Sequence, residues 1–135
     1  MSKIQEFLKN QEKSVMSNVE GKTIIDYFNN NAEEVPEYPA LNTPINSEYT
    51  GWDSVSWSAY RETVHNLASG LIDIGLQLED NAFIVANNVK EHFICDLGIM
   101  HAGAVPSTIY KQLKSGQIEY ISNLLEAKVA FVGDA

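Results

Sequence analysis

The sequence predicts an α/β fold in which a parallel sheet, built from a β-α-β-α-β unit, is preceded by N-terminal helices. Three apolar runs of strand length occupy residues 82–86, 104–110 and 128–132. Two stretches with helical periodicity, 90–102 and 115–125, separate them. Because the connections between these elements are short, we expect parallel strands joined by right-handed crossovers.

The first 20 residues are highly charged, and their apolar residues recur at helical spacing: Ile4, Phe7, Leu8 and Val15. This pattern predicts a peripheral N-terminal helix, with a partly solvated arm as the alternative. We expect residues 1–20 to form a separate helical arm, followed by an α/β subdomain over residues 21–135.

The second predicted helix starts after Thr23, whose hydroxyl can accept a hydrogen bond from a free amide of the first turn. Asp26 places a negative charge where the positive end of the helix dipole favours it. The helix should end before Pro36, because a residue that precedes proline is disfavoured in the helical region. The proline-rich segment 36–51 predicts a loop with a short strand near residues 40–43.

A third helix follows a short predicted strand that contains Trp52 and Val55. Ser56 or Ser58 can cap its N-terminus, and Gly75 can end it in a left-handed conformation. The strongest helical periodicity in the chain lies between these signals, at Tyr60, Val64, Leu67, Ala68 and Leu71.

The continuous apolar run 82–86 predicts a strand buried on both faces. The helix over 90–102 is apolar on most sides and should end at Gly103. Parallel strands need helices over both faces and neighbouring strands or protected edges. Nothing after Val132 supplies these, so we expect an incomplete sheet, unless the N-terminal helices close it.

The composition excludes some function classes. The chain of 135 residues has the length of one domain or part of one, and its formal net charge is -9. This charge argues against nucleic-acid binding and against simple docking on anionic lipid. The single cysteine, Cys95, cannot form an internal disulfide, and no apolar run is long enough for a signal peptide or a transmembrane segment. We therefore expect a cytoplasmic protein, with peripheral membrane contact through other parts as an open alternative.

Common catalytic motifs are absent. The eight glycines form neither a phosphate loop nor a dinucleotide-binding motif, and the sequence has no Gly-x-Ser-x-Gly or His-Glu-x-x-His. His92, Cys95 and Asp96 can share a helix face, which leaves a metal site as one hypothesis. In the alternative, His92 caps the helix or lies at its start without a function, Cys95 is a small buried apolar group, and Asp96 is solvated or paired with Lys90.

The remaining histidines, His65 and His101, have the pattern of helix-surface residues. Nothing in the sequence assigns either of them as a further ligand of a metal site. As a nucleophile, Cys95 is disfavoured because an apolar helix opposes the thiolate. A small metal-dependent hydrolase built around His92 is therefore the weakest of the functional hypotheses.

Polar residues follow each predicted strand of the parallel sheet: Asn87-Asn88, Tyr110-Lys111 and Gly133-Asp134. In open α/β sheets, ligands bind outside the carboxyl ends of the strands. Lys111 stands out as a cation in an acidic chain, beside a phenol. The alternative is that these residues only form turns.

Four segments in order resemble the opening of acyl-adenylate-forming ligases. They are Ser56-Trp57 with the helix that follows, the turn and strand over 75–85, the segment His101-Ala-Gly-Ala-Val-Pro106, and the strand over 126–132. The resemblance covers about residues 20–134. Gly51-Trp52 and Ser107-Thr-Ile-Tyr110 resemble the long-chain fatty acyl-CoA ligase branch in particular.

The sequence departs from that branch at two helix starts. Many relatives carry Arg-Pro-Glu after the strand-end asparagine, where this chain has Val89-Lys90-Glu91. A proline there would preset the first helical turn. Lys114-Ser115-Gly116 replaces a Pro-Glu pair at the next helix. These changes bear on the assignment to the branch, not on catalytic chemistry.

The resemblance implies a two-step reaction for the whole enzyme: a fatty carboxylate attacks the α-phosphate of ATP, and coenzyme A then displaces AMP. Such an enzyme uses ATP, Mg²⁺ and coenzyme A. Its Lys-terminated phosphate loop, Tyr-Gly-x-Thr-Glu segment, ribose-binding Asp and catalytic Lys are all missing from this sequence, so no catalytic residue is assigned. The position of Tyr110 and Lys111 is similar to that of a loop near the coenzyme A entrance in some relatives.

Two interpretations remain. In the first, the chain is an N-terminal piece of a long-chain fatty acid–CoA ligase, inactive alone and with no tightly bound cofactor. Its partners are then the rest of the ligase chain and, through it, the fatty acid. Exposed apolar surface should make such a piece prone to form homo-oligomers. In the second, the chain is a complete small α/β module that binds a ligand or a partner without catalysis.

Overall fold

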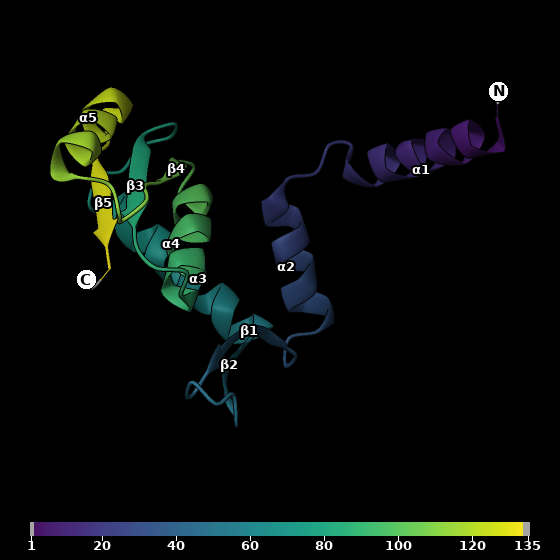
Figure 1. The fold of residues 1–135 in the computed structure, drawn as a ribbon, viewed down its shortest axis with the longest axis horizontal. Coiled ribbons are helices and arrows are strands. Elements are labelled where there is room, and N and C mark those ends of the chain that lie inside the picture. The colour runs from purple at the N-terminus through teal and green to yellow at the C-terminus, as the bar shows by residue number, and fades with distance from the viewer. Residues whose placement is uncertain (1, 134–135) are drawn as a thin grey trace.

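The computed structural model describes residues 2–133 and confirms the predicted α/β fold. Two helices come first, α1 (Lys3–Val19) and α2 (Ile24–Glu34). Both begin with a capping box, in which the Ser2 hydroxyl and the Thr23 hydroxyl each accept a bond from the amide three residues on. Helix α1 extends away from the rest of the molecule, as Figure 1 shows.

A small hairpin follows the helices. Strands β1 (Pro39–Pro44) and β2 (Trp52–Ser56) pair antiparallel, and helix α3 (Trp57–Asp73) starts directly after β2. The amide of Ala59 donates to the Ser56 hydroxyl over 3.3 Å, so Ser56 is the N-cap and Ser58 is not. Gly75 ends the helix region at φ 98°, a left-handed conformation that favours glycine.

The β-α-β-α-β unit contains β3 (Asn81–Val85), α4 (Lys90–His101), β4 (Val105–Thr108), α5 (Ser115–Leu125) and β5 (Val129–Val132). Strand β3 pairs in parallel with β4 on one side and with β5 on the other. The sheet order is therefore β4-β3-β5. Within residues 2–133, the outer edges of β4 and β5 have no strand partner.

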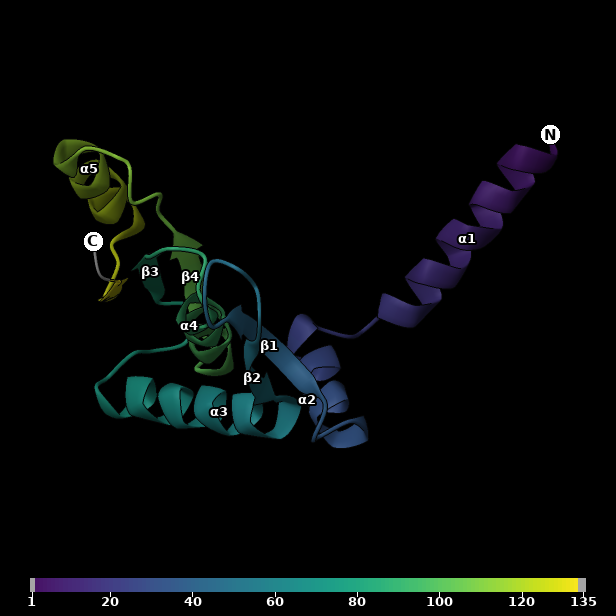
Figure 2. The ribbon, with the colours of Figure 1, turned by 60° about the horizontal axis from the view of Figure 1, so that its bottom comes forward.

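Helices cover the two faces of the sheet unequally. Helices α3 and α4 lie on one side and α5 lies on the other (Figure 2). Ala82 and Ile84 of β3 are fully buried and form the main core with side chains from α3 and α4, chiefly Leu71 and Ile99. The face of β3 that carries Phe83 is only half-buried. The prediction of a strand buried on both faces therefore holds for one face and only partly for the other.

A second core joins α2 to α3. It contains Phe28, Tyr60 and Val64, with Trp57 packed against it. The ring of Phe28 meets that of Tyr60 edge to face, with centroids 5.0 Å apart. Burial, followed by the nearby charge of Asp96, raises the pKa of Tyr60 to about 12.

Candidate functional site

The carboxyl edge of the sheet carries two adjoining pockets. Strands β3 and β5 are paired neighbours, and one pocket is lined by residues from the ends of both strands and from the first turns of α4. The chain leaves β3 towards β4 on one side and later returns to β5 on the other side. This reversal of strand order is the place where open α/β sheets bind ligands.

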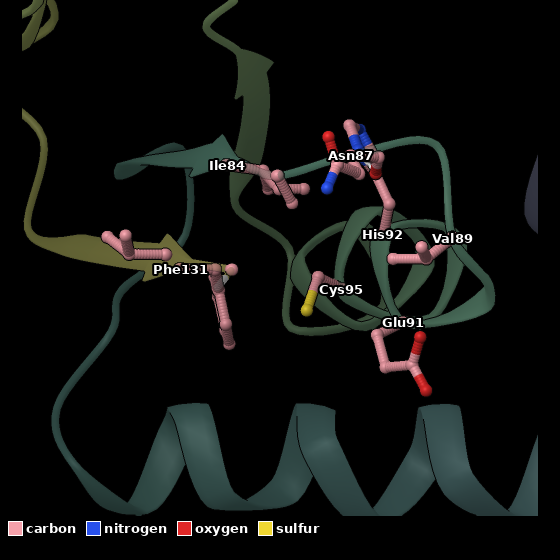
Figure 3. Close-up of a pocket in the computed structure, with 10 residues that line it drawn as sticks. Ile84, Asn87, Val89, Glu91, His92, Cys95 and Phe131 are labelled. Atoms are coloured by element: carbon pink, nitrogen blue, oxygen red, sulfur yellow. Dashed lines mark hydrogen bonds between the residues drawn. The ribbon is translucent and has the colours of Figure 1, made fainter. Parts of the chain in front are cut away.

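The first pocket, which we call the β3–β5 pocket, has a volume of about 370 Å³. Its walls are mainly apolar and come from Ile84, Val89 and Phe131. Cys95 and Phe131 lie on opposite sides of it in Figure 3, and Glu91 and His92 line it from the first turn of α4.

His92 separates this pocket from its neighbour and connects two strand ends. Its Nδ1 lies 3.3 Å from the carbonyl oxygen of Asn87, and its Nε2 lies 3.0 Å from Oγ1 of Thr108. Because a carbonyl can only accept, Nδ1 donates to Asn87, and Nε2 shares a hydrogen bond with the Thr108 hydroxyl. The imidazole is thus held between the end of β3 and the end of β4.

The three residues of the metal hypothesis do not converge. His92 points to Thr108, Cys95 lines the β3–β5 pocket, and Asp96 lines a different groove. Among residues 2–133, no three His, Cys, Asp or Glu side chains gather closely enough to hold a metal ion. Burial, followed by the charges of Glu91 and Asp96, raises the pKa of the Cys95 thiol, so the group stays protonated at neutral pH.

Asp96 does not pair with Lys90, which was one of the two alternatives for that carboxylate. The Lys90 ammonium instead lies 2.5 Å from the Asp53 carboxylate of β2, a hydrogen-bonded ion pair that raises the pKa of Lys90. Asp53 is 37 positions away from Lys90, so no local pattern predicts the contact. Burial raises the pKa of the Asp96 carboxyl, and the nearby His92 only partly offsets this.

The second pocket, the β3–β4 pocket, has a volume of about 240 Å³ and collects two of the predicted strand-end pairs. Asn87 and Asn88 follow β3, and Tyr110 and Lys111 follow β4. The side chain of Tyr110 is 74% exposed. Among the described residues, 2–133, no Asp or Glu lines this pocket, although the chain as a whole carries a net charge of -9. The third predicted pair is divided, because Gly133 lines the β3–β5 pocket and Asp134 lies outside the described residues.

His101 is not the plain surface residue that its sequence context predicts. Its ring is half-buried, with its centroid 5.5 Å from Phe28 and 5.1 Å from His65. Its Nδ1 donates to the carbonyl of Leu97 over 2.8 Å, while Nε2 is buried without a partner among residues 2–133. Burial, and then the charges of His101 and Arg61, lower the pKa of His65. These contacts join α2, α3 and α4, which are distant in sequence, so no local signal could reveal them.

The region of the chain that matches a known protein family includes the carboxyl edge of the sheet. Residues 28–135 match a family described as AMP-binding enzyme. Helix α1 and the start of α2 precede the matched region.

Several relatives are named ligases, and two of them show the extent of the match. The chain is 29% identical over 124 residues to the long-chain-fatty-acid–CoA ligase heimdall of Drosophila melanogaster, covering 90% of this chain and 18% of that protein. It is 28% identical over 116 residues to the vibriobactin-specific 2,3-dihydroxybenzoate-AMP ligase of Vibrio cholerae, covering 84% of this chain and 20% of the relative. The chain thus spans about a fifth of the length of these relatives.

The fold is similar to that of a solved adenylation enzyme. The N-terminal subdomain of Klebsiella oxytoca NpsA superposes with a TM-score of 0.71 at 20% identity, covering 83% of this chain and 28% of that one. This likeness confirms the predicted subdomain fold. Within residues 2–133, no helix combines the length and the apolar character needed to cross a bilayer.

Proposed function

Because the chain belongs to the family of AMP-binding enzymes, we propose that it forms the N-terminal part of an ATP-dependent long-chain fatty acid–CoA ligase. The relative from Drosophila melanogaster, named as such a ligase and matched over 90% of this chain, supports the fatty acid as substrate. In this proposal, residues 1–20 are an arm and residues 21–135 belong to the ligase subdomain. The ligase is cytoplasmic, with peripheral contact to a membrane.

The observation that carries the proposed role is that, among residues 2–133, no acidic side chain lines the β3–β4 pocket, although the chain is acidic. Coenzyme A carries phosphates and an adenine ring. Lys111 can attract the phosphates, and the exposed phenol of Tyr110 can stack on the base. We therefore propose that Tyr110 and Lys111 face coenzyme A. His92 supports this surface by holding Asn87 and Thr108 in place.

The residues do not fit the nucleotide-activating half of the reaction. Residues 2–133 contain no group of three or more His, Cys, Asp or Glu side chains that could hold a metal ion. The sequence also lacks a glycine-rich phosphate loop for ATP. We assign no step of adenylation to this chain, and place the sites for ATP, Mg²⁺ and the acyl group in other parts of the ligase.

The test compares two proteins in ATP–pyrophosphate exchange: the complete product of the reading frame that contains this chain, and residues 1–135 alone. We expect fatty-acid-dependent exchange from the complete product and none from residues 1–135. Exchange that responds only to 2,3-dihydroxybenzoate would overturn the fatty acid as substrate. A reading frame that ends at Ala135, with coenzyme A binding but no exchange, would support the non-catalytic binding module instead.

A further inference from the structure

Two histidines meet between α3 and α4, away from the carboxyl edge of the sheet. His65 lies on α3 and His101 is the last residue of α4, and the centroids of their rings are 5.1 Å apart. Among residues 2–133, the linings of the β3–β5 pocket and the β3–β4 pocket include neither of them. The proposed contacts with coenzyme A therefore do not use this pair.

The ring of His101 has the hydrogen bonding of a histidine that binds a metal ion. Its Nδ1 donates to the carbonyl of Leu97 over 2.8 Å, so the lone pair of the neutral ring is on Nε2. This Nε2 is buried and has no hydrogen-bond partner among residues 2–133. Histidines that bind metals almost always donate their other ring N–H to a carbonyl, a carboxylate or water. The arrangement of His101 thus favours a cation at Nε2.

The spacing of the two rings fits a single zinc ion. With Zn–N bonds of about 2.0–2.1 Å and a tetrahedral angle at the metal, the centroids of two coordinating imidazoles lie about 5 Å apart. The observed separation is 5.1 Å. His65 is exposed, and within residues 2–133 its only side-chain hydrogen-bond partner, the Ser69 hydroxyl, reaches its backbone carbonyl. Its ring is therefore free to turn a nitrogen toward Nε2 of His101.

The charges around the pair leave His65 in the form that binds metals. Burial, followed by the charges of His101 and Arg61, lowers the pKa of His65, so its imidazole is neutral at neutral pH. The guanidinium of Arg61 opposes a cation at this place. It lies 3.7 Å from the Glu33 carboxylate, which offsets its charge.

A third atom of suitable chemistry comes from α2. Oδ1 of Asn29 is buried and, like Nε2 of His101, has no hydrogen-bond partner among residues 2–133. At helical spacing Asn29 flanks the buried residues Phe28 and Ala32, and the Phe28 ring lies 5.5 Å from that of His101, centroid to centroid. Two imidazoles are one short of a group of three His, Cys, Asp or Glu, so the amide oxygen and a water complete the four positions of zinc.

We propose that His65 and His101, together with Asn29, bind one zinc ion that ties α2, α3 and α4 together. Because the ion binds only the folded chain, it stabilises the fold by mass action. The proposal is independent of the ligase function, and its failure would leave the coenzyme A surface untouched.

The test titrates ZnCl₂ into the full chain after removal of metals with EDTA, and follows binding by calorimetry. We expect one zinc ion per chain and an unfolding temperature that rises with the zinc concentration. His65→Gln should weaken binding by about 10- to 100-fold, the loss typical of a disrupted metal site. Since His65 is exposed, this variant should keep its fold, which circular dichroism checks. His101→Gln should weaken binding by at least as much.

Two controls exclude other zinc-binding groups. His92 is the third histidine of the chain and Cys95 its single cysteine. His92→Gln and Cys95→Ser should each leave the zinc affinity unchanged. Loss of zinc binding in either control, or unchanged binding in both His65→Gln and His101→Gln, would overturn the proposal.

Nitrogen-15 NMR of the imidazoles gives a readout that a merely structural role would not move. Zinc should shift the Nε2 signal of His101 while Nδ1 keeps its proton. Asn29→Asp should tighten zinc binding by about fivefold or more, because a carboxylate adds a charge beside the ion. An unchanged Nε2 signal and unfolding temperature at saturating ZnCl₂ would mean that a water molecule satisfies Nε2 of His101, and would contradict the zinc site.

Discussion

Nε2 of His92 lies 3.0 Å from Oγ1 of Thr108, so the first turn of α4 is bonded to the end of the neighbouring strand β4. The other ring nitrogen is bonded to the carbonyl of Asn87, which follows β3. One side chain therefore fixes the relative position of two strand ends. This arrangement sets the shape of the β3–β4 pocket, where the proposed coenzyme A contacts lie.

Removing the hydroxyl of Thr108 should loosen this edge. Thr108→Val keeps the shape of the side chain but leaves His92 Nε2 without its hydrogen-bond partner. We expect the free energy of unfolding to fall by about 0.5–1.5 kcal/mol, the usual net value of one hydrogen bond. Urea denaturation measures the change. Thr63→Val is the control, because the Thr63 hydroxyl bonds only to a carbonyl of its own helix. Equal effects of the two substitutions would contradict the bridging role of His92.

Two helical glycines should respond to alanine with opposite signs. A Cβ at Gly98 of α4 would lie 2.6 Å from Cδ2 and 2.9 Å from Cγ of Leu67, so Gly98 allows α4 to approach α3 closely. Gly98→Ala should destabilise the chain by about 1–3 kcal/mol through overpacking. A Cβ at Gly70 meets nothing within 4 Å, so Gly70→Ala should stabilise by about 0.5–1 kcal/mol through helix propensity. Thermal unfolding of both variants measures the two changes in stability. A more stable Gly98→Ala variant would contradict the close approach of α4 to α3.

The main core should depend on Ile99. Its side chain is 0% exposed and packs between α4 and the sheet. Ile99→Ala should cost about 2–5 kcal/mol, because the cavity adds to the lost transfer free energy. Ile74→Ala is the matched control, since Ile74 is 71% exposed and should change stability by less than about 0.5 kcal/mol. Denaturant titration should show this contrast, and similar losses for both variants would argue against the described core.

Stability should fall as the pH drops through the ordinary pKa of histidine. The folded chain holds the pKa of His65 below its ordinary value of 6.5, so the unfolded chain takes up the proton first. The resulting loss of unfolding free energy is absent well above pH 6.5 and grows as the pH falls below 6.5. His65→Gln should reduce this slope between pH 7 and pH 5, measured as the difference in unfolding free energy. An identical slope in the variant would show that His65 does not contribute.

Local signals in the sequence predicted the elements well. The capping role of Thr23, the end of α2 before Pro36 and the bounds of α5 all depend on neighbouring residues, and all are confirmed. The parallel order of the strands followed from the short connections between them. The prediction that Tyr110 and Lys111 share an edge with Asn87 and Asn88 is also confirmed, because parallel strands end on the same side.

Contacts between distant parts of the chain were missed. The pairing of Lys90 with Asp53 and the packing of His101 on Phe28 depend on how the helices and the hairpin are placed in space. The bridge from His92 to Thr108 was missed for the same reason. Helical spacing grouped His92 with Cys95 and Asp96, but their partners come from other elements.

The most direct test of the central claim is the dependence of thioester formation on coenzyme A in the complete ligase. Lys111→Glu should raise the KM for coenzyme A about fivefold, the equivalent of about 1 kcal/mol for one exposed ion pair, and leave ATP–pyrophosphate exchange unchanged. Lys128→Glu serves as the control, because Lys128 precedes β5 at the opposite edge of the sheet. A selective rise in KM with Lys111→Glu is the predicted result. Equal KM values for both variants and the wild type would contradict a coenzyme A surface at the carboxyl edge.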